Sequence, residues 1–358
     1  MSQTSQETVF TPTGVFYKTT ELPKSTKKNH KDLGLSEEEL ISMFRIMYLQ
    51  RRFEERAAQS YQKGKFGGFC HLYIGQEAVS TSFQQVLNAD DDMVSGYRIH
   101  GIGLARGISA RACMAELYGK ATGCVHGKGG SMHFFDAERH FWGGHGIVGG
   151  QIPLGAGLAF ANKYNNTKRL AVSFFGDGAV DQGSLNESFN LAQLWKLPVI
   201  FVVENNGYSM GTAVGRHSAG ELHQRALPYG MKHAVLNGLD LFSMIEKLQE
   251  VAADIRENSN PWFLEVRTYR YRGHSMSDPQ NYRTKDEMDK FKQLDPIEKL
   301  RTYIISNKIA EESALEAIEE EVNAEVMDAI DFAEKSPFPD AEDLYRDVYV
   351  ENDFPFTV

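Results

Sequence analysis

The sequence lacks any long apolar run. No stretch approaches the roughly 18 apolar residues that a membrane-spanning helix needs, so we expect no contact with a membrane. Residues 1–20, MSQTSQETVFTPTGVFYKTT, contain no apolar core of a signal peptide, and no arginine occurs before Arg45, which is atypical of an organelle transit peptide. These absences favour a cytoplasmic, bacterial protein.

Cysteine is scarce, and basic residues are outnumbered. The three cysteines, Cys70, Cys113 and Cys124, cannot all pair and have no spacing typical of a metal site, which favours reduced thiols in an intracellular protein. Lys and Arg number 38 against 48 Asp and Glu, for a formal net charge of -10. This balance argues against a nucleic-acid or anionic-membrane surface, although a small anionic substrate needs only a local basic site.

What the chain does have is length and apolar content. Its 358 residues are 42% hydrophobic, enough for a well-buried core. We expect residues 1–33 to form an extended N-terminal arm and residues 34–358 to form a single α/β domain with C-terminal helices.

Several segments have helical patterns. Ser36 and Glu39 form a capping-box pattern at the start of an amphipathic stretch that Gly64 ends. Further helices are predicted over Gly75–Leu87 and, in the acidic tail, over Ala314–Lys335.

The centre of the chain predicts a strand, a helix and a second strand. The strands are expected over Leu170–Phe175 and Val199–Asn206, and a helix with a second capping box, Ser184 and Glu187, lies between them. This order is typical of a crossover in a parallel sheet. Phe263–Tyr271 reads as a further strand.

Two oxygen-bearing side chains follow these strands. Asp177 comes after the first strand and Asn206 ends the second. Ligands of open parallel sheets bind beyond the carboxyl ends of the strands, and such oxygens suit Mg²⁺, which often shares its shell with phosphate. Gly176 and Gly178 would let a phosphate approach the backbone. Alternatively, Asp177 is only a turn or helix N-cap residue and binds no ligand.

The surrounding motifs resemble a known family. The pattern of GDG at Gly176–Gly178 and NN at Asn205–Asn206, around a complete strand–helix–strand unit, is similar to the signature of thiamine diphosphate enzymes. From about residue 36 to residue 348 the chain resembles the alpha subunits of the first component of pyruvate dehydrogenase complexes. The resemblance is carried, in order, by GFCHLYIGQEA, YRIHG, HGKGGSMH, GDGAVDQG, LWKLPVIFVVENNGYSMGT and YRYRGHSMSDPQNYRT.

The resemblance implies roles for individual residues. Asp177, Asn206 and the backbone carbonyl of Tyr208 match metal ligands. Further positions match contacts to the cofactor: Tyr97, Arg98, Gly178 and Ala179 at the diphosphate, Gly146 and Val148 around the ring, and Met210 as an apolar wedge that bends the cofactor.

Two histidines match catalytic positions in the family. His274 lies on a loop expected to be mobile, and His71 lies near the substrate carboxylate. Arg270 and Arg272 flank the same loop and are candidates for binding anionic groups. His145 stands where relatives often carry asparagine.

The resemblance also implies a fold, a reaction and partners. The fold would be the thiamine diphosphate-binding fold, with a mostly parallel sheet and helices on both faces. The reaction would be oxidative decarboxylation of pyruvate with transfer of the acetyl group to a lipoyl acyltransferase. It would need Mg²⁺ and a beta subunit, in an alpha2-beta2 tetramer, that supplies the glutamate acting on the aminopyrimidine.

The motifs leave other functions open. A branched-chain 2-oxo acid or acetoin as substrate would preserve most of them, although GHSMSDP is more similar to the pyruvate type. A scaffold without activity is disfavoured by the presence of Asp177, Asn206 and His274.

Overall fold

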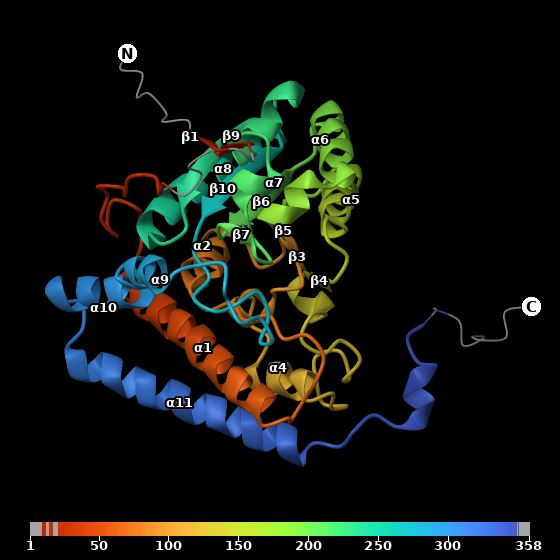
Figure 1. Ribbon diagram of the computed structural model, residues 1–358, viewed down its shortest axis with the longest axis vertical. Helices are drawn as coiled ribbons and strands as arrows, with labels where there is room; N and C mark the ends of the chain where they lie inside the picture. The colour runs from red at the N-terminus through yellow and green to blue at the C-terminus, as the bar shows by residue number, and fades with distance from the viewer. Residues whose placement is uncertain (1–8, 12–13, 17–20, 349, 351–358) are drawn as a thin grey trace, which may run out of the picture.

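A six-stranded sheet, parallel throughout, forms the centre of the molecule (Figure 1). The computed structural model describes residues 9–11, 14–16, 21–348 and 350. The strand order is β4-β3-β5-β6-β10-β9. The strands are β3 (Asp92–Gly96), β4 (Phe141–His145), β5 (Ala171–Gly176), β6 (Val199–Asn205), β9 (Lys232–Asn237) and β10 (Trp262–Arg267). Two short antiparallel pairs lie outside this sheet: β1 (Val9–Thr11) with β2 (Gly14–Phe16), and β7 (Tyr208–Ser209) with β8 (Thr212–Ala213).

Helices connect and surround the strands. The α-helices are α1 (Glu37–Gln62), α2 (Glu77–Val86), α3 (His100–Ala105), α4 (Ala110–Leu117), α5 (Gln151–Tyr164), α6 (Gly183–Trp195), α7 (Val214–His217), α8 (Leu241–Asn258), α9 (Lys285–Lys292), α10 (Pro296–Ser306) and α11 (Glu312–Lys335). Short 3-10 helices are η1 (Ala137–Arg139), η2 (Asp177–Asp181), η3 (Leu222–Tyr229) and η4 (Ala341–Leu344). Among the residues described, no helix combines the length and the apolar character needed to cross a membrane.

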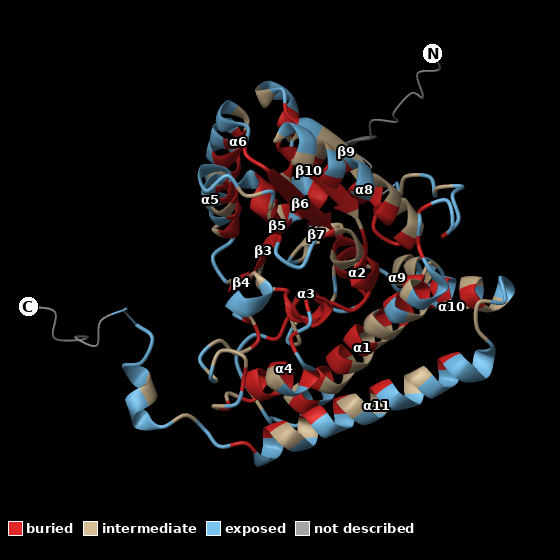
Figure 2. Cartoon of the chain, turned by 180° about the vertical axis from the view of Figure 1, so that it is seen from behind, coloured by how far each residue is buried: buried red, intermediate tan, exposed pale blue. Residues whose placement is uncertain are grey.

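Alternate side chains of the central strands enter two different cores. Phe174 and Val202 pack in a core that includes residues of α2 and α8, whereas Phe175, Val203 and Phe263 pack in a core that includes residues of α5 and α6. Both faces of the sheet are therefore covered, which explains the continuous apolar runs of β5 and β6. Figure 2 shows the central strands and most of α2 buried, and the outer sides of α5, α6 and α8 exposed. The predicted α/β fold with helices on both faces is confirmed.

The long helices α1 and α11 lie side by side at one end of the molecule (Figures 1 and 2). The predicted capping box opens α1: the Ser36 amide donates to Glu39 Oε2 at 2.8 Å, and the Glu39 amide donates to Ser36 Oγ at 3.2 Å. Gly64, with a φ of +68°, lies just beyond the end of α1, as expected of a residue that stops a helix.

Two of the predicted element details are wrong. Ser184 does not cap α6, because the chain continues through η2 and the helix already begins at Gly183, with Gln182 in the capping position and no side-chain cap. The Ser184 hydroxyl instead donates to Gly149 O at 3.2 Å. The strand predicted over Phe263–Tyr271 ends at Arg267, opposite the last residue of the neighbouring strand β6.

The N-terminal segment is only partly described. Residues 1–8, 12–13 and 17–20 of the predicted arm lie outside the described residues, and β1 and β2 form a short hairpin. Beyond the hairpin, Arg267 donates to Glu21 O and Asn237 donates to Pro23 O, so this part of the chain lies against the end of the sheet. The division into residues 1–33 and 34–358 stays a prediction.

Candidate active site

One cavity of about 830 Å³ opens where β3, β4, β5 and β6 end. Residues from the carboxyl ends of these strands line it, which is the usual ligand position in an open parallel sheet. The structure brings together at this cavity all the residues that the sequence analysis assigned to a site: His71, Tyr97, Arg98, Gly146, Val148, Asp177, Gly178, Ala179, Asn206, Tyr208, Met210 and His274. His145 and Arg270 also line it, whereas Arg272 does not.

Asp177 directly follows β5 and is 2% exposed. Its Oδ2 is buried and has no well-aligned hydrogen bond; among the described residues, its one charged neighbour is His217, whose Nε2 lies 3.4 Å away. A buried carboxylate oxygen with one long contact is costly unless a ligand completes its contacts. A Cβ at the next residue, Gly178, would lie 2.1 Å from Ser209 Oγ, so a larger residue there would require the serine side chain to move.

The side-chain oxygen of Asn206 and the carbonyl oxygen of Tyr208 both lie near the guanidinium group of Arg270. Arg270 Nη1 lies 3.4 Å from Asn206 Oδ1 and 3.5 Å from the Tyr208 carbonyl oxygen. These distances are long for hydrogen bonds, so both oxygens retain acceptor capacity. Together with Asp177 they form the carboxylate, amide and carbonyl set that Mg²⁺ prefers, and the residues present therefore fit a divalent cation.

Arg98 and Arg270 are buried without a carboxylate partner among the residues described. Arg98 is 8% exposed and donates to two backbone carbonyls, Leu72 O at 2.6 Å and His274 O at 2.9 Å. Arg270 is 1% exposed and donates to Met210 O and the Tyr282 hydroxyl. Burial, together with the neighbouring charge of Arg270, lowers the pKa of Arg98 to about 10. Buried cations of this kind call for an anion.

His71, Tyr97 and His274 form an aromatic cluster at the cavity. The ring centroids of His71 lie 4.5 Å from Tyr97 and 5.1 Å from His274. Burial, then the charge of Arg98, lowers the pKa of His71 to about 2 and that of His274 to about 4. Both imidazoles are therefore neutral near pH 7. Nδ1 of His71 is buried without a hydrogen bond.

The apolar candidates are accessible to a ligand. Val148 is 45% exposed and Met210 is 65% exposed, although both line the cavity. Met210 has a φ of +52°, a conformation that is uncommon for a residue other than glycine and is often found at functional sites. Its carbonyl accepts a hydrogen bond from Arg270 Nη2 at 3.2 Å, which helps to hold it there.

Sequence reasoning missed several residues of this cavity. Glu204, at the end of β6, lines it and accepts a hydrogen bond from the Tyr73 hydroxyl at 2.5 Å; burial raises the pKa of its carboxyl to about 7. Gln76 lines it too, and its Oε1 accepts from Asn206 Nδ2 at 3.2 Å. A carboxylate inside the apolar run VIFVVENN was the available signal for Glu204. Gln76 had no comparable signal.

A family model described as "Dehydrogenase E1 component" matches residues 45–342. The chain belongs to the dehydrogenase E1 component family. Several relatives align with this chain over most of the length of both proteins, and about half of the aligned residues are identical. One from Rickettsia bellii, named pyruvate dehydrogenase E1 component subunit alpha, is 50% identical over 314 residues, covering 87% of this chain and 96% of the relative.

Two other organisms carry similar E1 components, also named as alpha subunits of pyruvate dehydrogenase. The Rhizobium meliloti relative is 49% identical over 315 residues, covering 87% of this chain and 90% of its own. A mitochondrial relative from Dictyostelium discoideum is 46% identical over 320 residues, covering 88% of this chain and 84% of its own. The predicted family is therefore confirmed, whereas the roles of individual residues in this E1 component stay predictions.

Proposed function

We propose that this chain is the alpha subunit of a cytoplasmic enzyme that oxidatively decarboxylates pyruvate. With a beta subunit it would bind thiamine diphosphate and Mg²⁺ and transfer the acetyl group to the lipoyl group of an acyltransferase. The names of relatives that are about 50% identical over most of the chain support pyruvate as the substrate.

The observation that carries the proposal is the meeting of two kinds of group in one cavity. Arg98 and Arg270 are buried cations in need of an anion, and beside them lie oxygens of Asp177, Asn206 and Tyr208 suited to a divalent cation. A metal-bound diphosphate would satisfy both. Bound thiamine diphosphate supplies the electron sink that lets the carboxyl group of a 2-oxo acid leave as carbon dioxide.

This chain's residues would then act in three ways. The two guanidinium groups and the oxygen ligands would bind the diphosphate and its metal. Val148 and Met210 would hold an apolar ring and exclude water from its surroundings. His71 and His274, both neutral near pH 7, would hydrogen-bond the substrate; His71 does not readily gain a proton, which leaves His274 as the candidate for proton transfer.

The test is a substrate screen on the co-expressed alpha and beta chains. The turnover of pyruvate, of a branched-chain 2-oxo acid and of acetoin would be compared, each with and without thiamine diphosphate and Mg²⁺. An artificial electron acceptor would report the turnover. We expect the highest kcat/KM with pyruvate and no turnover without cofactor. A preference for another substrate, or turnover that does not depend on thiamine diphosphate, would contradict the proposal.

A pair of variants separates the site from general damage. Asp177→Ala should weaken Mg²⁺-dependent binding of thiamine diphosphate by more than about 100-fold in calorimetry, because a direct metal ligand matters more than the groups behind it. Asp328→Ala, which removes an exposed carboxylate paired with Arg111, should leave the affinity unchanged. Wild-type affinity in Asp177→Ala would argue against the metal assignment.

A further inference from the structure

A buried carboxylate lies in the central strand β10, where an apolar side chain would be usual. Glu265 is 0% exposed and both its oxygens have two hydrogen-bond donors. Oε1 accepts from Asn205 Nδ2 at 2.9 Å and from Arg267 Nε at 2.9 Å. Oε2 accepts from the His223 amide at 3.2 Å and from its Nδ1 at 3.0 Å. Although burial opposes the charge, the His223 hydrogen bond and the charge of Arg267 hold the pKa of Glu265 at about 2.

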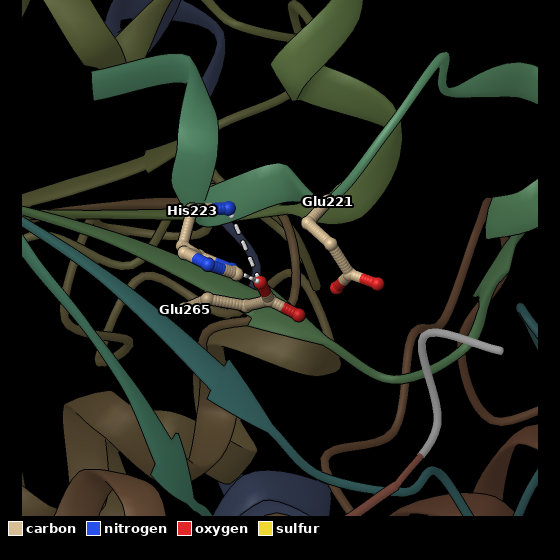
Figure 3. Close-up of side chains that lie close together, drawn as sticks. All are labelled: Glu221, His223 and Glu265. Carbon is tan, nitrogen blue, oxygen red and sulfur yellow. Dashed lines mark hydrogen bonds and ion pairs between the residues drawn. The ribbon is translucent and has the colours of Figure 1, made fainter. Parts of the chain in front are cut away.

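Glu265 belongs to a group that has the side chains of a metal site. Figure 3 shows Glu221, His223 and Glu265 close together, and their ligand atoms lie within 4.8 Å of one another. However, a cation already pairs with both carboxylates, since Arg267 lies 2.7 Å from Glu221 Oε2 and 2.9 Å from Glu265 Oε1. A metal ion would have to displace the guanidinium and the donors to Glu265, so the group does not fit a metal.

What the group does hold in place is Asn205. This residue is fixed at three points: its Nδ2 donates to Glu265, its Oδ1 accepts from the Gly207 amide at 3.1 Å, and its carbonyl accepts from the Thr268 amide at 2.9 Å. The bond to Gly207 closes an Asx-turn, in which an asparagine side chain shapes the backbone two residues on.

The turn that Asn205 shapes contains two of the three candidate metal ligands. The third ligand, Asp177, lies in η2. Asn206 follows Asn205 directly, and the next residue after Gly207 is Tyr208. The Asn206 side-chain oxygen and the Tyr208 carbonyl both lie near Arg270 Nη1 at the cavity, whereas the Asn205 side chain contacts Glu265 and does not line the cavity. Of the two consecutive asparagines, the first therefore anchors the turn to the sheet and the second faces the cavity.

We propose that Glu265 is a positioning residue for the divalent cation, acting through Asn205. It fixes the Asn205–Tyr208 turn, and so sets where the Asn206 and Tyr208 oxygens stand. This inference rests on the proposed function, because the cation is the one assigned to the diphosphate. Groups that orient metal ligands typically change metal affinity by about 10- to 100-fold when they are removed.

The test uses Mn²⁺ as the probe, bound to the alpha–beta complex at saturating thiamine diphosphate and followed by electron paramagnetic resonance. Glu265→Gln keeps the volume of the side chain and removes the charge and two acceptor positions. We expect it to bind Mn²⁺ about 10- to 100-fold more weakly than the wild type. Activity should be recovered at saturating Mn²⁺, which a generally damaged enzyme would not show.

The matched control is Glu221→Gln. Glu221 contacts the same arginine at 2.7 Å but does not touch Asn205, so its loss should change Mn²⁺ affinity by less than about threefold. A loss of affinity as large in Glu221→Gln as in Glu265→Gln would overturn the proposal, because it would show that the ion pairs matter and the contact to Asn205 does not.

Asn205→Ser provides an independent variant in case Glu265→Gln does not assemble. It removes the amide that links the turn to Glu265, and we expect the same loss of Mn²⁺ affinity. The variant with both substitutions should bind Mn²⁺ about as well as either single variant, because each substitution removes the same contact between Asn205 and Glu265. Wild-type affinity in a folded Glu265→Gln or Asn205→Ser complex would overturn the proposal. A wild-type complex that binds no Mn²⁺ would overturn the proposed function, and with it this inference.

Discussion

His71 is an imidazole placed where it does not readily gain a proton. It is 5% exposed, its Nδ1 has no hydrogen bond, and burial with the charge of Arg98 lowers its pKa to about 2. The unfolded chain takes up this proton near pH 6.5. Between these two values the unfolded state binds more protons than the folded state, so folding loses stability as pH falls.

This difference predicts a pH-dependent change in the unfolding temperature. For His71 alone the loss reaches about 2 kcal/mol at pH 5, which corresponds to a few degrees. The unfolding temperature of the cofactor-free complex should therefore fall further between pH 7 and pH 5 in the wild type than in His71→Gln. The exposed His126 provides a control, since His126→Gln should follow the wild type. Parallel curves for wild type and His71→Gln would contradict the burial argument.

At the scale of elements, the segment from Arg270 to Arg283 connects directly to the proposed diphosphate site. Arg98 donates to the carbonyl of His274, and Arg270 donates to Met210 O and Tyr282. Within the segment, the His274 amide and the Tyr282 hydroxyl both donate to Asp278. An anion that binds the guanidinium groups of Arg98 and Arg270 would therefore affect the residues of this segment to which they are hydrogen-bonded.

We predict that the segment is mobile without cofactor and becomes ordered when thiamine diphosphate binds. Limited proteolysis of the complex, with and without the cofactor and Mg²⁺, should show cleavage between Arg270 and Arg283 slowing when both are present. Cleavage after the exposed Lys308, which lies outside the cavity, should stay constant. The same rate in the Arg270–Arg283 segment under both conditions would count against the idea.

The elements that could be predicted were those with strong local signals. β5 and β6 are continuous apolar runs, the helix between them has apolar residues at helical spacing, and Asp177 and Asn206 stand out because they interrupt an apolar pattern. The position of β3 in the sheet could not be predicted, because DMVSG is short and its neighbours β4 and β5 are distant in sequence.

Burial of charge was the part of the site that the sequence did not reveal. Arg270 stands in the polar stretch YRYRG, where nothing separates it from the more exposed Arg272. Its burial follows from tertiary contacts with the Asn206–Met210 segment. Glu265 was hidden in the same way, because Asn205 of β6 and His223 of η3 reach it only when these elements pack against β10.

At the scale of the whole molecule, large apolar side chains are exposed on α5 and α6, two helices that contact each other. They include Leu154 at 46%, Tyr164 at 80% and Leu194 at 68%. Ile147, which precedes α5 in the sequence, is 78% exposed. Large exposed apolar side chains in one region are typical of surfaces that bind another chain, which agrees with a beta subunit as partner.

We therefore predict that the isolated chain is catalytically inert. Alone it should bind thiamine diphosphate weakly and aggregate through the exposed apolar side chains. Adding the beta chain should restore decarboxylation of pyruvate, read with an artificial electron acceptor, and sedimentation should show an alpha2-beta2 tetramer. The isolated acyltransferase, which should not restore activity without the beta chain, is the control. Turnover by the beta-free chain at the rate of the complex would show that the site is not divided between subunits.

The contact between Gly178 and Ser209 also constrains the order in which this sequence can evolve. A methyl group at position 178 would lie 2.1 Å from Ser209 Oγ and 3.0 Å from its Cβ, and both atoms disappear if Ser209 becomes glycine. Gly178→Ala therefore requires the Ser209 side chain to turn away as long as the serine is present, whereas after Ser209→Gly the same change meets neither atom. The cost of a change at position 178 thus depends on which of the two positions changes first.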